Sequence, residues 1–142
     1  EFEIDFFLVG GSLLVKDSLD HVVNKLKQDC QIPVILFPGS HFHLSKKADG
    51  ILFLSLISGR NPDFLIGQHV LAAPILKEYN IETLPTGYML VGNSDTTVAY
   101  ISNTLPIPAN KPDIASSTAM AGEMLGMKLI SKDSRSPRGM TA

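Results

Sequence analysis

Short, wholly apolar runs alternate along this chain with stretches of helical periodicity, and each run ends at a turn that contains glycine or serine. The clearest runs are residues 6–9, 32–37 and 50–56. A run without polar residues is typical of a strand buried on both faces, as in parallel sheets with helical crossovers. The alternation therefore predicts an α/β fold of parallel βα units and argues against an antiparallel sandwich.

The other elements are predicted from apolar spacing and from the residues that begin and end them. Ser18 is placed to cap a first helix, whose apolar residues recur at helical spacing. Further helices are expected from Asn61-Pro62 to about residue 76 and at residues 113–127. The remaining predicted strands are residues 83–91, a short hairpin strand at residues 97–101, and a strand that begins at residue 128.

Two architectures use such units: the doubly wound open sheet and the eight-stranded (β/α)8 barrel of TIM type. Short, uniformly apolar strands that lead into glycine- or serine-containing loops favour the barrel. A complete barrel takes about 200 residues or more, so the 142 residues here predict an incomplete one. We expect residues 1–130 to form this partial barrel domain. Residues 131–142 are polar and aperiodic, and we expect a disordered tail there.

Composition and charge exclude several classes of function. Hydrophobic residues make up 44% and charged residues 18%, which is the composition of a globular domain. The net charge of −2 gives no reason to expect binding to nucleic acid, which would call for a basic face. No apolar run approaches the roughly 20 residues of a transmembrane helix. Cys30 is the single cysteine, so no internal disulfide can form, and a reducing, cytoplasmic compartment is expected.

In a parallel barrel the active site lies at the carboxyl ends of the strands, so the residues that follow each strand are the first candidates. Gly10, Gly11 and Ser12 follow the first strand. Glycines let a backbone approach a ligand closely, and a serine hydroxyl can contact phosphate or Mg²⁺. The same residues would equally make a tight turn. Gly39, after the next strand, is open to the same two interpretations.

Two histidines, an arginine and a tyrosine are the other candidates. His41 and His43 have no third ligand at metal spacing and are interpreted as exposed loop histidines. Arg60 precedes the second helix, where it would hold a phosphate, cap the helix together with Asn61, or join a subunit interface. Tyr88 lies within an apolar strand, which indicates a core or pocket-lining aromatic.

A series of short motifs runs in order from about residue 4 to residue 130. They are Asp5-Phe-Phe-Leu-Val-Gly-Gly-Ser12, Pro33-Val-Ile-Leu-Phe-Pro-Gly39, Ala48-Asp-Gly-Ile-Leu-Phe-Leu-Ser-Leu56, Ser58-Gly-Arg-Asn-Pro62, Pro85-Thr-Gly-Tyr88, Lys111-Pro-Asp-Ile-Ala115 and Leu125-Gly-Met-Lys-Leu-Ile130. Each motif is weak alone, but the ordered set is specific. On these residues the chain closely resembles the geranylgeranylglyceryl phosphate synthase family, which includes the bacterial heptaprenylglyceryl phosphate synthases.

The resemblance implies a barrel-fold prenyltransferase. Such an enzyme joins a polyprenyl (geranylgeranyl-type) diphosphate to the 3-hydroxyl of sn-glycerol 1-phosphate and so forms an ether-lipid precursor. It implies Mg²⁺, which would neutralise the charge that builds on the departing diphosphate. Matched to the family pattern, Ser12 is the Mg²⁺ ligand, and the substrate-binding residues are Gly10, Gly11, Ser12 and Gly39. Arg60 and Asn61 match an element expected to be structural or interfacial, in which Gly59 replaces a commoner Asn.

Relative to the family pattern, parts of the site are absent. The first strand, with an Asp that binds Mg²⁺, would precede Glu1, and the last two strands, with their phosphate contacts, would follow. After Ile130 the family continues with a Tyr, an acidic residue and Gly-Ser-Gly. Asp133 lies near the expected acidic position, but its neighbours do not match. The general base and the glycerol phosphate site therefore stay unassigned.

Two alternatives to a prenyltransferase remain. One is another phosphate-binding biosynthetic barrel. The other is a truncated, catalytically inactive fragment that acts only as a structural or association module, and we expect little transferase activity from the 142 residues alone. For the enzyme, the expected partners are its two substrates and further copies in a homo-oligomer, with peripheral membrane contact through the lipid product. The sequence does not indicate the prenyl chain length.

Overall fold

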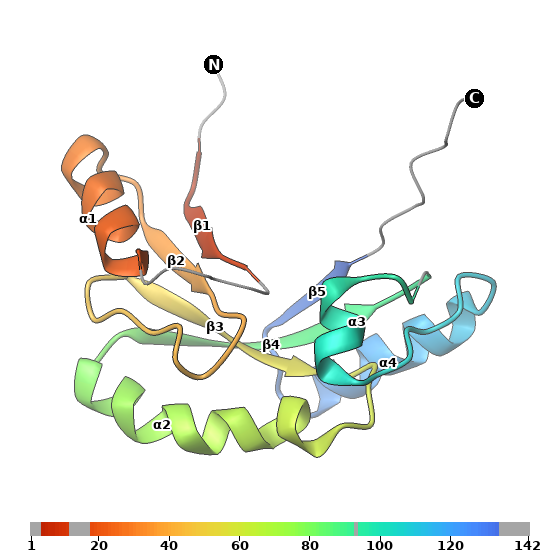
Figure 1. Ribbon diagram of the computed structural model, residues 1–142. Coiled ribbons are helices and arrows are strands. Elements are labelled where there is room, and N and C mark those ends of the chain that lie inside the picture. Colours follow the sequence, from red (N-terminus) through yellow and green to blue (C-terminus); the bar gives the residue numbers. More distant parts are fainter. Residues whose placement is uncertain (1–3, 12–17, 93, 134–142) are drawn as a thin grey trace. The chain divides into compact units, whose positions relative to one another are not determined.

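Strands and helices alternate in the computed structural model, which describes residues 4–11, 18–92 and 94–133 (Figure 1). The strands are β1 (Phe7–Gly10), β2 (Val34–Phe37), β3 (Gly50–Leu56), β4 (Glu82–Leu90) and β5 (Leu129–Asp133). The helices are α1 (Leu19–Asp29), α2 (Gln68–Tyr79), α3 (Thr97–Ser102) and α4 (Pro112–Met124), with a π-helical turn, η1 (Asp63–Gly67), ahead of α2. No helix of the described part is long and apolar enough to cross a membrane.

The strands pair in parallel. β1 pairs with β2, β2 with β3, and β4 with β5, and the strand order follows the order along the chain. Helices lie between β1 and β2, between β3 and β4, and between β4 and β5 in the sequence. The predicted α/β fold of parallel strands is thus confirmed, and β1 to β4 agree with the predicted strands within two residues at each end.

The chain divides into two compact units that are interleaved in the sequence. The first unit comprises residues 1–54 and 67–84, and the second comprises residues 55–66 and 85–142. The chain passes from the first unit to the second within β3, returns to the first within η1, and passes to the second again within β4. Each unit therefore has its own part of these two strands.

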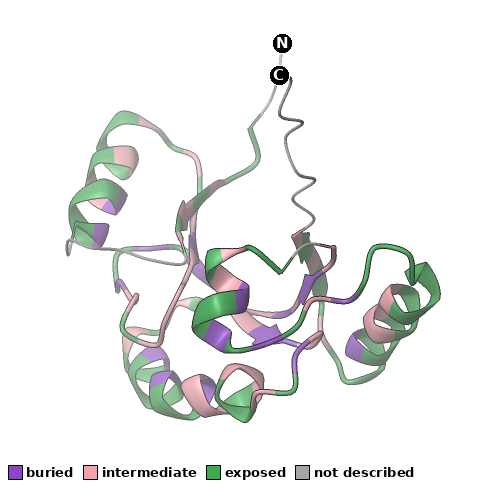
Figure 2. Cartoon of the chain, turned by 45° about the vertical axis from the view of Figure 1, so that its right-hand side comes forward, coloured by how far each residue is buried: buried purple, intermediate pink, exposed green. Residues whose placement is uncertain are grey.

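The core of the first unit packs α1 and α2 against one face of its strands. The register places Phe7 beside Val34 and Val9 beside Leu36, so these four side chains share a face. Buried residues lie along one side of each of these helices (Figure 2). The buried members of this core are Leu19, Val23, Val34, Leu36, Ala48, Ile51, Ala72 and Leu76.

In the second unit, two glycines allow α4 to approach β4 closely. A Cβ on Gly87 would lie 2.7 Å from Ile57 Cδ1, 2.8 Å from Met127 Sδ and 2.9 Å from Ile130 Cδ1. A Cβ on Gly122 of α4 would meet the same three atoms at 3.0–3.3 Å. A separate core of Leu56, Leu90 and Ala99 packs with Phe64, Tyr88 and Val98.

The hairpin strand predicted at residues 97–101 is wrong, because these residues form helix α3. Thr96 has extended backbone geometry, and its side chain accepts a hydrogen bond from the Ala99 amide, which caps the helix. Asn103 ends the helix in the left-handed conformation. The β-branched residues suggested a strand, but the cap at one end and the left-handed residue at the other favour a short helix.

The last described strand extends past the domain boundary predicted at residue 130. β5 continues to Asp133, and the Val91 amide donates to the Asp133 carbonyl oxygen at 3.0 Å. Residues 131–133 therefore belong to the sheet, because pairing with β4 satisfies their backbone although they have no apolar pattern. Residues 134–142 lie outside the described residues, so a tail there stays a prediction.

Candidate active site

The carboxyl ends of parallel strands are where loops converge and where ligand sites form in α/β folds. In the first unit these are the ends of β1 and β2. In the second unit they are the ends of β3, β4 and β5. The candidate residues therefore fall into one group in each unit.

Glycine at position 10 is required by the neighbouring strand. Gly10 has a φ of +144°, and a Cβ there would lie 2.0 Å from the carbonyl oxygen of Phe37. A Cβ on Gly11 would meet no described atom within 4 Å, so the space beside Gly11 is open. Ser12 lies outside the described residues, and its roles as Mg²⁺ ligand and substrate contact stay predictions. Packing thus explains Gly10 without a ligand, whereas nothing in the described fold requires glycine at position 11.

The loop after β2 contains Gly39 and both loop histidines. The Gly39 amide donates to Nδ1 of His43 at 3.2 Å. Gln68 is the first residue of α2, and its Oε1 accepts from the His41 amide at 2.9 Å and lies 3.0 Å from Nδ1 of His41. The histidines were predicted to be exposed, but both are half-buried and hydrogen-bonded.

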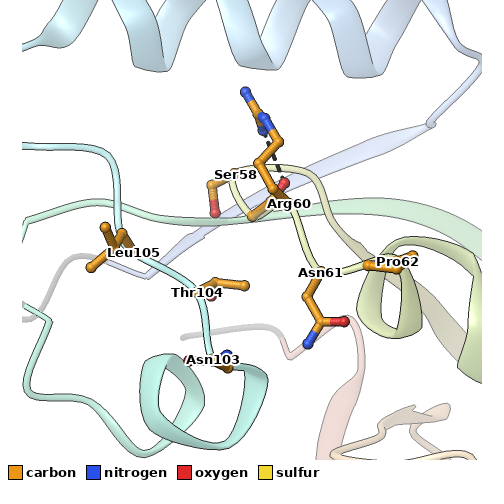
Figure 3. Close-up of a pocket in the computed structure, with 8 residues that line it drawn as sticks. Ser58, Arg60, Asn61, Pro62, Asn103, Thr104 and Leu105 are labelled. Atoms are coloured by element: carbon orange, nitrogen blue, oxygen red, sulfur yellow. Dashed lines mark hydrogen bonds between the residues drawn. The ribbon is translucent and has the colours of Figure 1, made fainter.

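A pocket of about 510 Å³ lies in the second unit, beside the segment that follows β3 (Figure 3). In Figure 3 the Asn61 side chain extends toward α3, while that of Arg60 points the opposite way. Asn61 Nδ2 donates to the Ser102 carbonyl at 2.6 Å, and its Oδ1 accepts from the Asp63 amide at 3.0 Å. The residues that line the pocket are Ser58, Gly59, Arg60, Asn61, Pro62, Asn103, Thr104 and Leu105.

Most polar side chains of this pocket are used within the fold. Ser58 Oγ accepts from the Leu90 amide at 3.0 Å, and Thr104 Oγ1 lies 2.6 Å from Ser102 Oγ. Arg60 is exposed and donates from Nη1 to the Gly59 carbonyl at 2.9 Å. No carboxylate among the described residues forms an ion pair with Arg60. Asn61 therefore has a structural role, and Arg60 retains N–H donors for an anion or a partner.

Tyr88 and Asp133 meet at the ends of β4 and β5, a contact that the sequence interpretation did not predict. The Tyr88 hydroxyl donates to Asp133 Oδ2 at 3.2 Å, and both side chains are half-buried. The register pairs Tyr88 with Ser131 and Leu90 with Asp133, which puts the two side chains on the same face of the sheet. The sequence contains one signal for this pair: Asp133 lies near the position after Ile130 where the family pattern has an acidic residue.

No group of three or more His, Cys, Asp or Glu side chains converges to hold a metal within the described ranges 4–11, 18–92 and 94–133. At the end of β1, the described residues Gly10 and Gly11 offer only backbone atoms. Mg²⁺ usually takes one or two carboxylates together with substrate phosphates and waters. The described residues therefore do not make a Mg²⁺ site by themselves.

Comparison with known proteins gives a consistent set of relatives. The model of the PcrB family matches residues 2–136. The geranylgeranylglyceryl phosphate synthase of Spirosoma linguale is 55% identical over 137 residues, which cover 96% of this chain and 55% of that protein. The enzyme of the same name from Pyrococcus furiosus is 45% identical over 131 residues, covering 92% of this chain and 52% of that protein. The chain thus spans about half the length of the curated relatives it matches.

Solved structures show the same relationship. The (S)-3-O-geranylgeranylglyceryl phosphate synthase of Thermoplasma acidophilum, in complex with its substrate sn-glycerol-1-phosphate, superposes with a TM-score of 0.85 at 33% identity. The match covers 94% of this chain and 54% of that one. The Thermoplasma volcanium enzyme superposes with the same TM-score at 32% identity. This likeness confirms the predicted partial (β/α) barrel.

Proposed function

The chain belongs to the PcrB family, and from this we propose that the protein containing it is a prenyltransferase. It joins a polyprenyl diphosphate of geranylgeranyl type to sn-glycerol 1-phosphate and forms an ether-lipid precursor. The observation that carries the proposal is the identity of up to 55%, along nearly the whole chain, with relatives named geranylgeranylglyceryl phosphate synthase. The complex of the Thermoplasma acidophilum relative with sn-glycerol-1-phosphate supports the choice of acceptor.

The reaction is a substitution at the allylic C1 of the prenyl donor. The 3-hydroxyl oxygen of glycerol phosphate forms a bond to C1, and the bond from C1 to the diphosphate oxygen breaks. The diphosphate leaves with the bonding electron pair, and the hydroxyl proton must pass to a base. The protein therefore has to hold both substrates, stabilise the charge on the diphosphate and accept one proton.

The proposed substrate-binding residues are Gly10, Gly11, Ser12 and Gly39. The open space beside Gly11 supports a close backbone approach by the diphosphate. The Gly39 amide already donates a hydrogen bond to His43 Nδ1, so a contact of Gly39 with substrate would use its Cα or its carbonyl group. Ser12 is proposed from the family resemblance alone.

We assign the proton acceptor to Asp133. Its carboxylate is half-buried at a strand end and receives the Tyr88 hydroxyl, which would fix its orientation and leave its other oxygen for the acceptor hydroxyl. In the full-length protein, Asp133→Asn should lower kcat by about a hundredfold or more, with a smaller effect on KM. Tyr88→Phe, which keeps the carboxylate, should have a milder effect. An Asp133→Asn enzyme with normal kcat would remove this assignment.

Mg²⁺ is proposed as the cofactor from the resemblance and from the chemistry of a diphosphate leaving group. When bound, it would neutralise charge on the diphosphate. Because the described residues do not supply a carboxylate set, no step above depends on the ion. Transferase rate against Mg²⁺ concentration, for wild type and Ser12→Ala, tests the proposed ligand. An unchanged Mg²⁺ dependence in the variant would return Ser12 to a turn residue.

A homo-oligomer, a cytoplasmic location and peripheral membrane contact through the lipid product complete the proposal. Helix α2 exposes Val70, Leu71 and Ile75, with relative exposures of 63%, 57% and 37%. Apolar side chains grouped on an outer helix face are typical of a protein interface, which supports association with a second copy. The single cysteine, Cys30, supports a reducing compartment.

The enzyme is favoured over a non-catalytic association module because the relatives are named as enzymes. The test is a transfer assay on the full-length protein with labelled geranylgeranyl diphosphate and sn-glycerol 1-phosphate. We expect a labelled ether product that requires the 1-phosphate and does not form with sn-glycerol 3-phosphate. The 142-residue chain assayed in parallel should show little activity. Failure of the full-length protein to transfer any prenyl group would favour the module.

A further inference from the structure

The two histidines of the loop after β2 are fixed in opposite hydrogen-bonding states at Nδ1. His41 and His43 are separated by one residue, and both are half-buried in the first unit. Each ring nitrogen Nδ1 has a partner whose role is settled by a backbone amide, and an amide N–H can only donate. The protonation of each Nδ1 therefore follows from the geometry.

His41 must donate from Nδ1. The backbone amide of His41 lies 2.9 Å from Gln68 Oε1, so this side-chain atom is the acceptor oxygen and not the amide nitrogen. The same oxygen lies 3.0 Å from Nδ1 of His41. Since an amide oxygen only accepts, Nδ1 carries the proton. Gln68 thus holds both the backbone and the ring of His41 from the start of α2.

His43 must accept at Nδ1. The Gly39 amide donates to this nitrogen at 3.2 Å, so Nδ1 of His43 carries no proton. An imidazolium has protons on both nitrogens. The Gly39 bond of His43 is thus incompatible with a proton on Nδ1, whereas the Gln68 bond of His41 requires one.

We infer that His41, oriented by Gln68, binds the diphosphate of the prenyl donor through Nε2. Nε2 lies across the ring from Nδ1 and so points away from Gln68, and no residue of the described part forms a hydrogen bond with it. In the imidazolium form Nε2 donates, and a charge-assisted bond to a phosphate oxygen is among the strong hydrogen bonds of proteins. His41 stands two residues from Gly39 in the loop after β2. The inference rests on the proposed function for the identity of the ligand.

The first experiment titrates the isotopically labelled full-length protein with inorganic pyrophosphate and follows the ring nitrogens by NMR. Without ligand, neutral His41 should show the Nδ1–H tautomer and His43 the Nε2–H tautomer. Pyrophosphate should shift the His41 signals toward the doubly protonated ring, while His43 changes less. Unchanged His41 signals at saturating pyrophosphate would overturn the inference.

Variants separate orientation by Gln68 from a merely structural effect. Gln68→Leu has a similar size but no acceptor, so His41 should lose the Nδ1–H preference, and pyrophosphate affinity should fall about tenfold. His41→Ala should weaken binding at least as much. Gln68→Glu keeps an acceptor oxygen and should retain the His41 tautomer and most of the affinity. His21→Ala, which removes an exposed histidine on α1, is the matched control and should leave affinity unchanged.

Transferase kinetics distinguish this inference from the proposed function. In an active enzyme, His41→Ala and Gln68→Leu should raise the KM for prenyl diphosphate more than the KM for sn-glycerol 1-phosphate. An enzyme that turns over normally in both variants overturns the inference and leaves the function standing. A protein that binds pyrophosphate at His41 but transfers no prenyl group supports the diphosphate site and rejects the prenyltransferase.

Discussion

Three glycines that each lie near the end of a strand differ in why the fold needs, or does not need, a glycine at that position. Gly10 is fixed by the Phe37 carbonyl 2.0 Å from where its Cβ would stand, whereas Gly11 faces open space. Gly59 is intermediate, since its Cβ would lie 2.6 Å from Thr104 Cγ2 and 3.2 Å from Thr104 Cβ. A Cβ at position 59 would therefore clash with the side chain of one residue, Thr104.

Gly59→Ala should destabilise the second unit by about 1–3 kcal/mol, because Thr104 has to move out of a packed position. Thr104→Ser removes the closest atom and keeps a hydroxyl for Ser102. The double variant should therefore recover most of the loss. Urea unfolding of the wild type, both single variants and the double variant measures the coupling. Losses that simply add would contradict the proposed clash.

Asp49 gives a pH dependence whose direction follows from its contacts. Burial raises the pKa of Asp49. Hydrogen bonds from Lys27 and the Val34 amide, together with the Lys27 charge, lower this pKa by more than burial raises it, so the pKa of Asp49 lies below its usual value. Lys27 Nζ lies 2.5 Å from Asp49 Oδ1, and both side chains are 40% exposed. A carboxylate with a depressed pKa stabilises the fold above its unfolded pKa and loses that contribution as pH falls through the folded pKa.

Asp49→Asn should therefore be less stable than wild type near neutral pH, and the difference should shrink as pH falls from about 5 toward about 2. The difference should stay below about 1 kcal/mol, because the pair is exposed to solvent. The Asn oxygen can still accept from the Val34 amide, so the comparison isolates the charge. The measurement is the urea midpoint at several pH values. A gap that is the same at low and neutral pH would show that the ion pair contributes nothing.

At the scale of elements, local end signals decided more than residue propensity. Residues 97–101 contain the β-branched residues typical of a strand, yet Thr96 and Asn103 make α3 a helix. The helix predicted to start at Asn61-Pro62 does start there, since helical residues run from Pro62 through η1 into α2. The start of α3 depends on the bond from the Ala99 amide to the Thr96 side chain, which average propensity does not describe.

Thr96→Ala should cost about 1 kcal/mol, because it removes the side-chain acceptor of the Ala99 amide at 3.1 Å. Thr96→Ser keeps the hydroxyl and should be close to wild type. Thr97→Ala, at an exposed position inside the same helix, is the control and should have little effect. Urea unfolding together with hydrogen exchange at the Ala99 amide measures the change. Equal losses in the Thr96→Ala and Thr97→Ala variants would argue against the cap.

At the scale of the whole molecule, the chain is two compact units that share β3 and β4. No linker marks the division, because each unit is assembled from separate stretches of sequence. A prediction that looks for polar or flexible boundaries could only treat residues 1–130 as continuous. Partial barrels of this kind also bring chain-distant residues to strand ends, as with Tyr88 and Asp133.

The apolar face of α2 predicts association between copies of the full-length protein. Val70→Glu should lower the mass measured by light scattering, because a charge on an interface is costly to bury. The unfolding midpoint of the dissociated form should change little, since Val70 is 63% exposed within the chain. Gln28→Glu adds the same charge at an exposed site on α1 and should leave the mass unchanged. An unaltered mass in the Val70→Glu variant would place any interface elsewhere.

The sequence alone determined the α/β class, the positions of β1 to β4 and the family. These properties are encoded locally, because wholly apolar runs of strand length are stable only inside a parallel sheet and the family motifs are contiguous. The sequence also predicted the loops after β1, β2 and β3 that contain the candidate residues, because glycine or proline follows each apolar run.

Only the tertiary structure decided what the candidate residues do. The Tyr88–Asp133 bond joins side chains 45 residues apart, and the Gln68 contacts with His41 span 27 residues. The Tyr88–Asp133 bond depends on the register between β4 and β5, and the Gln68 contacts depend on where α2 begins. A local sequence pattern predicts neither the register nor the position of α2. For the same reason the opposite states of His41 and His43 became visible only when their backbone and side-chain partners had positions in space.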